Sequence, residues 1–211
     1  MAIDDLLDEH EQGERVRSWL RANGAGILGG IVLGLALIWG WQWWQQQRSG
    51  KQMQAGADFL AATSALEQGA TDKAKAHLEA LPEGAYATLG ALSLARSQVE
   101  AGQRDEAIAT LRAIKADDPA LAEVAVQRLA RLLIDTGKPK EALAALAGLN
   151  EDAGTLQVRG DAYAALEQDE QAREAYTRAL ALIEVGSPQR NMVELKLSDV
   201  GGDVAATEAG S

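Results

Sequence analysis

An uncharged stretch of 26 residues, from Ala22 to Gln47, constrains this chain of 211 residues more than any other feature. Its apolar part runs from Gly24 to Trp44. At 1.5 Å of rise per residue, such a helix spans about 30 Å, the thickness of the hydrocarbon core of a bilayer. The sequence therefore predicts one transmembrane helix, which we assign to residues 22–47, after a leader formed by residues 1–21.

Tryptophans mark both ends of this predicted span. Four of the five tryptophans close it, and one precedes it. The membrane-interface residues predicted from this clustering are Trp19, Trp39, Trp41, Trp43 and Trp44. A cleaved signal peptide is the alternative, but such a peptide begins with a short basic region and ends at small residues. Here the leader carries three basic and six acidic residues, so we expect an uncleaved anchor.

The lysines and arginines that flank the span give its orientation. Arg15, Arg17 and Arg21 precede it, and Arg48 and Lys51 follow it. Because basic residues are retained on the cytoplasmic side, three against two favours a cytoplasmic N-terminus, with the rest of the chain translocated.

Small residues recur at four-residue intervals within the span and form a predicted helix-pairing face: Ala22, Gly26, Gly30 and Gly34. Such a face allows the backbone of another helix to approach closely. Glycine is also frequent in spanning helices that do not pair. Pairing with a second copy, pairing with another membrane protein and mere tolerance of glycine all remain open at this point.

The rest of the chain contains an internal repeat. Four similar segments place alanines at positions 74, 107, 142 and 172, at spacings of 33, 35 and 30 residues. These spacings cluster around the tetratricopeptide period of 34 residues. Glycines at 69, 102 and 137 lie five residues ahead of three of the alanines, as expected for the turn within a helix pair. A generic helical bundle does not predict this longer spacing.

We therefore predict an all-α protein in which a tetratricopeptide-like solenoid of about four helix pairs occupies residues 48–186. The fourth unit is the most regular. Gly160, Ala172 and Ala179 stand where paired helices must touch, and Tyr163 and Tyr176 fill the space around them. Residues 187–198 are predicted to form a C-terminal capping helix, with Ser187 as its N-cap. Residues 199–211 are small and polar, and we expect them to be disordered.

Solenoids of this kind bind partners on the wall built by the first helix of each pair. A lysine and asparagine set for clamping a C-terminal carboxylate is absent, and the apolar members suit an amphipathic helix or an extended apolar segment. Ordinary packing between repeats remains the alternative for those members. The predicted concave protein-binding surface comprises Phe59, Thr63, Leu66, Leu89, Leu92, Arg96, Val99, Val124, Gln127, Arg131, Ile134, Gln157, Asp161 and Ala164.

Composition narrows the function further. The net charge is −11, of which residues 52–211 carry −10 (15 basic and 25 acidic residues), so nucleic-acid binding is not expected. Cysteine is absent, and His10 and His77 are the only histidines. No nucleotide-binding or zinc-protease motif is present. We expect no enzymatic activity, no cofactor and no metal site.

The leader, the span and the repeats together resemble the YfgM family, the ancillary subunits of the SecYEG protein translocon. The resemblance covers almost the whole chain. It rests on the block from Glu14 to Leu20, on Asn23 and Gly24 opening a glycine-rich span, on Gly40, Trp41 and Trp44 closing it, and on the segment Met192 to Leu197. The additional tryptophans and the long polar tail depart from the family pattern.

The resemblance implies a single-pass protein of the bacterial inner membrane, with a cytoplasmic leader and a periplasmic repeat domain. It also implies association with SecYEG and with the membrane-anchored periplasmic chaperone PpiD. The expected function is an adaptor that tethers a protein-binding surface beside the translocon and aids the handling of newly translocated proteins. Two alternatives are a scaffold for envelope assembly without translocon contact and a docking platform of reversed topology in the cytoplasm.

Overall fold

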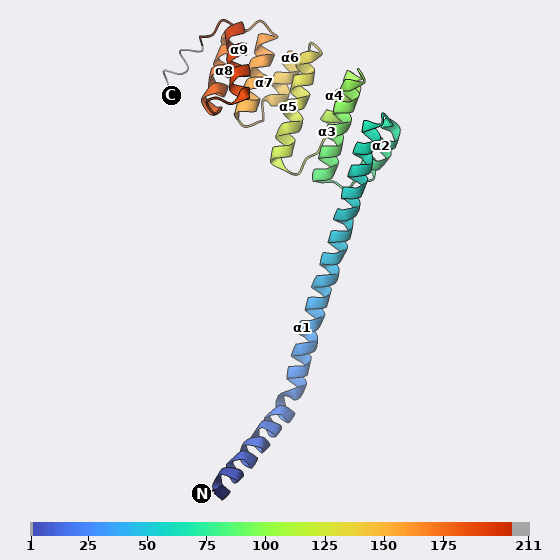
Figure 1. The fold of residues 1–211 in the computed structure, drawn as a ribbon, viewed down its shortest axis with the longest axis vertical. Helices are drawn as coiled ribbons and strands as arrows, with labels where there is room; N and C mark the ends of the chain where they lie inside the picture. Colours follow the sequence, from blue (N-terminus) through green and yellow to red (C-terminus); the bar gives the residue numbers. More distant parts are fainter. Residues whose placement is uncertain (1, 204–211) are drawn as a thin grey trace. The chain divides into compact units, whose positions relative to one another are not determined.

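The computed structural model describes residues 2–203, with side chains described for residues 16–47 and 50–203. The described part is helical, which confirms the predicted all-α class (Figure 1). Two compact units divide between Gln54 and Ala55. The tail residues 204–211, predicted to be disordered, lie outside the described residues, as does Met1.

Helix α1 spans Ala2–Glu67 and contains all of the first unit's helical structure. From Val16 onward it includes a window of mean hydropathy 1.8, none of which is buried within the protein. Among the described residues it is the one helix long and apolar enough to cross a membrane. The helix does not end with the uncharged stretch at Gln47, because residues 48–67 contain no proline to stop it. Its last turns therefore form the first helix of the second unit.

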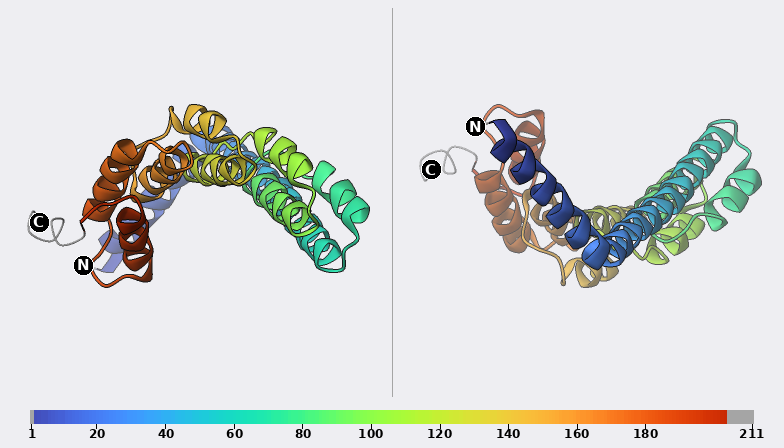
Figure 2. Two further views of the ribbon diagram at one scale, coloured as in Figure 1. Left: turned by 90° about the horizontal axis from the view of Figure 1, so that it is seen from above. Right: turned by 90° about the horizontal axis from the view of Figure 1, so that it is seen from below.

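The second unit is a row of helix pairs. Residues 55–67 of α1 pair with α2 (Thr71–Glu79), α3 (Ala85–Glu100) with α4 (Arg104–Arg112), α5 (Pro119–Asp135) with α6 (Pro139–Leu146), and α7 (Ala153–Ala164) with α8 (Asp169–Leu182). Helix α9 (Pro188–Asp199) follows alone. Viewed along the row, successive pairs follow a curve from α2 to α9 (Figure 2). Four pairs and a terminal helix are the predicted architecture.

The repeat alanines explain how closely each pair packs. Ala74, Ala107, Ala142 and Ala172 are all 0% exposed, because a second helix leaves room there for nothing larger than a methyl group. Three of these alanines belong to two core clusters of apolar side chains. Ala107 and Ala142 lie in the cluster that extends from α3 to α7, and Ala172 lies in the cluster that extends from α7 to α9.

Left-handed residues end the first helix of each pair. Gly69, Gly102 and Gly137 have φ angles of +71°, +79° and +73°, as predicted for the turns. The fourth turn has no glycine, and Glu167 takes the same conformation with φ +57°. In that turn the amide of Gln168 donates to the carbonyl of Tyr163 over 3.0 Å, so the geometry is kept despite the side chain.

The terminal helix α9 is capped as the sequence predicts, with the hydroxyl of Ser187 accepting from the amide of Arg190 and Pro188 in the first turn. The buried guanidinium of Arg190 donates to the carbonyl of Leu180 over 3.0 Å and so satisfies the open end of α8. After α9, the amide of Gly202 bonds the carbonyl of Leu197 over 2.8 Å. The predicted tail boundary at residue 199 thus lies in the last turn of α9.

Candidate protein-binding surface

The residues of the predicted concave protein-binding surface differ in solvent exposure: some are exposed, some half-buried and some buried. Exposed members are Leu89, Arg96, Val124 and Arg131. Half-buried members are Phe59, Thr63, Leu66, Val99, Gln127, Ile134, Asp161 and Ala164. Leu92 and Gln157 are each only 6% exposed and belong to the interior.

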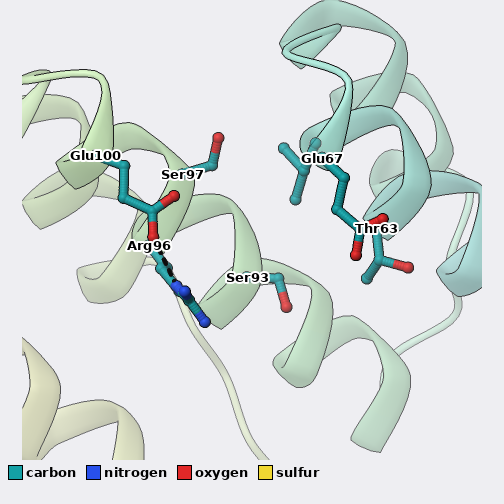
Figure 3. A pocket seen from close by; sticks show the side chains of 7 residues that line it. Thr63, Glu67, Ser93, Arg96, Ser97 and Glu100 are labelled. Atoms are coloured by element: carbon teal, nitrogen blue, oxygen red, sulfur yellow. Dashed lines mark hydrogen bonds and ion pairs between the residues drawn. The ribbon is translucent and has the colours of Figure 1, made fainter.

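A polar groove separates the end of α1 from α3 (Figure 3). Its volume is about 250 Å³. The side chains that line it come from both helices and are mostly polar: Thr63, Leu66 and Glu67 from α1, and Ser93, Arg96, Ser97 and Glu100 from α3. Arg96 and Glu100 pair over 2.8 Å along one side of α3, and the hydrogen bond with Glu100 raises the pKa of Arg96 above its ordinary value.

A second groove, of about 270 Å³, lies between α3 and α5. The lining is mostly apolar: Leu92, Ala95, Val99, Leu111 and Leu132, with Arg96, Glu100 and Arg128 as the polar members. The two grooves share Arg96 and Glu100. The first helices of the first three pairs therefore present a continuous surface with two depressions.

The C-terminal part of the wall is closed by contacts within the chain. Asp161 accepts two hydrogen bonds from the ammonium of Lys196 on α9, over 2.7 and 2.8 Å, and one from the hydroxyl of Tyr176 over 2.8 Å. Gln189 of α9 donates to the side chain of Gln157 over 3.5 Å. The predicted wall residues Gln157 and Asp161 therefore position the terminal helix, because α9 takes the place of a further first helix.

A polar cluster also joins α5 to α7. Asp152 caps α7 by accepting from the amide of Thr155 over 2.9 Å, and Gln127 donates to the hydroxyl of Thr155 over 3.1 Å. Interaction with the neighbouring carboxyl of Asp152 raises the pKa of Glu123. The predicted wall residue Gln127 is thus engaged between repeats.

Several residues of this surface were missed by the sequence analysis. Arg128 lines the apolar groove, and Tyr86 stacks obliquely on Phe59 with ring centroids 5.6 Å apart. Arg128 directly follows the predicted Gln127 on α5. A prediction that included one more residue per helical turn on this face would have contained it. Tyr86 had no such signal, because its neighbour comes from another helix.

The predicted helix-pairing face and the predicted membrane-interface tryptophans of the first unit are largely exposed. A Cβ atom added at Gly26, Gly30 or Gly34 would have no neighbour within 4 Å, so that face is open along the described span. Ala22 on the same stripe is exposed as well. The tryptophan side chains range from 43% exposed at Trp44 to 76% at Trp39.

Within residues 16–47 and 50–203, no group of three or more His, Cys, Asp or Glu side chains could hold a metal ion. A third groove, between α3 and α4, has a volume of about 480 Å³ and is lined by Glu83, Ala87, Thr88, Ala91, Thr110, Ala113, Ile114 and Lys115.

Along the chain, one long apolar helix is followed by a solenoid of helix pairs, which defines a repeat protein with a candidate membrane anchor. The chain belongs to the tetratricopeptide repeat-like domain family, whose model matches residues 17–202.

Two curated relatives carry one and the same name, Ancillary SecYEG translocon subunit. One, from Escherichia coli (strain K12), is 27% identical over 112 residues, which are 52% of this chain and 54% of the relative. The other, from Haemophilus influenzae (strain ATCC 51907 / DSM 11121 / KW20 / Rd), is 25% identical over 129 residues, 58% of this chain and 63% of the relative. The matches thus span between half and two thirds of each relative. They confirm the resemblance to the YfgM family that the sequence indicates.

Proposed function

We propose that this protein is a membrane-tethered adaptor of the SecYEG translocon that binds other proteins through its helical repeats. The observation that carries the proposal is the combination of one candidate span with a repeat solenoid in a chain similar to two ancillary SecYEG translocon subunits. Tethering raises the effective concentration of the binding surface near emerging chains. Neither a catalytic step nor a cofactor is part of this role.

The proposed location is the bacterial inner membrane, crossed once, with the N-terminus in the cytoplasm and the repeats in the periplasm. The flanking basic residues support this orientation, with three before the span and two after it. Exposed tryptophans along the described span support contact with lipid headgroups at its ends.

The proposed partners are SecYEG and a PpiD-like periplasmic chaperone. We infer that the glycine face of the span meets a partner helix in the membrane, because Gly26, Gly30 and Gly34 leave it open. Pairing of the chain with a second copy would use the same face. The surface around the two grooves on α1, α3 and α5 is the proposed site for a chaperone or a client segment.

Photocrosslinking in native membranes tests the proposal. A photoreactive residue at Gly30 probes the span, and one at Leu89, which is 38% exposed, probes the wall. We expect translocon components among the products from Gly30 and a periplasmic chaperone or client among those from Leu89. Self-crosslinks alone from both positions would refute the adaptor role and favour a scaffold without translocon contact.

Topology is tested separately with a reporter fused after Ser211. The proposal predicts a reporter that is active in the periplasm. Activity restricted to the cytoplasm would reverse the orientation and make the repeats a cytoplasmic docking platform.

A further inference from the structure

The groove between α3 and α5 combines an apolar lining with arginines, and this combination indicates which kind of polypeptide could bind there. Its volume of about 270 Å³ is below the 300 to 1,000 Å³ typical of small-molecule pockets. The half-buried Val99 on α3 is its most accessible apolar side chain, and Leu132 on α5 and Leu111 on α4, which are 7% and 6% exposed, form its floor. Such a depression suits apolar side chains of a polypeptide laid across the wall rather than an enclosed ligand.

Positive charge lies beside this apolar lining. Arg128 lines the groove, and Arg131 is one turn further along α5. Both residues are exposed by their total accessible surface, although the guanidinium of Arg131 is partly shielded from water. Partial burial lowers the pKa of Arg131 from its ordinary value, and the charge of Arg128 acts in the same direction.

The two carboxylates whose charges act on Arg131 have other partners. Asp161 and Asp152 both act on its charge. However, Asp161 is held by Lys196 over 2.7 Å, and Asp152 caps α7.

The ion pairs found in residues 16–47 and 50–203 likewise leave Arg128 and Arg131 without a carboxylate within 4.0 Å. Glu100, which also lines the groove, is paired with Arg96 over 2.8 Å. Two arginines on α5 therefore lie at or near an apolar groove without an ion-pair partner among the described residues, on a domain whose residues 52–211 carry a net charge of −10.

We propose that this groove binds an acidic amphipathic segment of a partner polypeptide, with its apolar side chains between α3 and α5 and its carboxylates paired with Arg128 and Arg131. The inference rests on the proposed function, because it names the kind of segment that the binding wall accepts. The acidic domain repels acidic chains at long range, so a segment binds only when it supplies the apolar contacts as well. This requirement selects amphipathic segments over acidic chains in general.

Fluorescence anisotropy with the full chain in nanodiscs of neutral phosphatidylcholine tests the proposal. The probe is a labelled synthetic peptide that forms a helix with leucines on one face and glutamates on the other. We expect it to bind, whereas a peptide with glutamine in place of glutamate binds about tenfold more weakly, since each exposed ion pair contributes modestly. A peptide with serine in place of leucine should not bind. Equal or tighter binding of a lysine-containing peptide would overturn the proposal.

Charge reversal locates the site on the protein. The double variant Arg128→Glu/Arg131→Glu should weaken the acidic peptide by about tenfold or more. The matched control Lys115→Glu/Lys140→Glu makes the same change in net charge at two exposed lysines outside the groove and should bind as the wild type does. Arg128→Gln/Arg131→Gln gives an intermediate effect and is the variant to use if reversal disturbs the fold. Equal weakening in both reversal variants would show a long-range effect and overturn the assignment.

Failure of this inference differs from failure of the adaptor role. Translocon crosslinks from Gly30 do not depend on the groove. If they persist while the acidic peptide fails to bind, the adaptor role stands and the groove assignment is wrong. If they are absent from the wild type, the translocon assignment fails whatever the peptide does.

Discussion

Replacing Gly160 with alanine tests the closest helix contact in the solenoid. Gly160 lies on α7 against the ring of Tyr176 on α8, and an added Cβ atom would stand 2.4 to 2.9 Å from three ring carbons. Ordinary carbon contacts are about 3.5 to 4.0 Å. The ring cannot move away freely, because it is 2% exposed and its hydroxyl donates to Asp161 over 2.8 Å.

The expected magnitude combines two opposing terms. Overpacking of a well-filled interior costs about 1 to 3 kcal/mol, whereas alanine in a helix is favoured over glycine by about 1 kcal/mol. Given how close the ring atoms are, the steric term should prevail, with a net loss of about 1 to 2 kcal/mol. Gly90→Ala is the matched control. Its added Cβ would stand 2.3 Å from one methyl carbon of Leu78, a half-buried side chain that can turn aside, so this variant should be neutral or slightly more stable.

Urea unfolding of the full chain in detergent micelles, followed by circular dichroism, measures both effects. Tryptophan fluorescence would not serve, since all five tryptophans lie between Trp19 and Trp44. A midpoint for Gly160→Ala equal to or above that of the wild type would refute the reasoning. In a Tyr176→Leu background the same substitution should cost less, because its steric partner is gone.

Further substitutions probe the turns, the pH dependence and the terminal helix. Glu167→Gly should raise the free energy of unfolding by about 1 kcal/mol, because glycine adopts the left-handed conformation without strain; an unchanged urea midpoint would contradict this. Burial raises the pKa of Tyr176 far above its ordinary range, with the charge of Asp161 adding to the effect. Above about pH 10 the unfolded tyrosine ionises while the folded one keeps its proton, so stability should fall as pH rises. The urea midpoint should accordingly drop more between pH 7 and pH 11 in the wild type than in Tyr176→Phe, and equal drops would exclude this cause. Arg190→Ala should cost about 3 kcal/mol by removing a buried donor from the end of α8; hydrogen exchange should show faster opening of α9, and unchanged protection would contradict the assignment.

The sequence predicts the repeat architecture well because the alanines at 74, 107, 142 and 172 have one physical role. A position where two helices touch allows only a small residue, so its spacing records the repeat directly. The turn glycines are predictable for a similar reason, since few residues adopt a left-handed conformation without strain. Glu167 is the exception, and no property of its side chain indicates the turn.

The binding surface is less predictable than the fold. Gln157 and Asp161 share the helical register of the wall, yet the sequence of α7 does not reveal that α9 will cover them. Leu92 and Arg96 lie one turn apart on α3, but one is 6% exposed and the other is open to solvent. This difference in exposure depends on how the neighbouring helices pack against α3, which the sequence of α3 alone does not specify.

The sequence predicts that the membrane span ends at Gln47, and this boundary remains a prediction. The helix itself continues to Glu67, which the loss of the uncharged pattern did not indicate. Polarity changes mark where a bilayer ends, whereas helices end where proline, a capping residue or a turn stops them. The two boundaries need not coincide.

Isolation of the tagged full chain from its native membranes in mild detergent tests the central claim most directly. The adaptor account predicts that quantitative mass spectrometry finds SecYEG subunits enriched with the wild-type chain, and that a variant with Gly26, Gly30 and Gly34 changed to leucine loses much of that enrichment. Recovery of the wild-type chain without SecYEG would contradict the account.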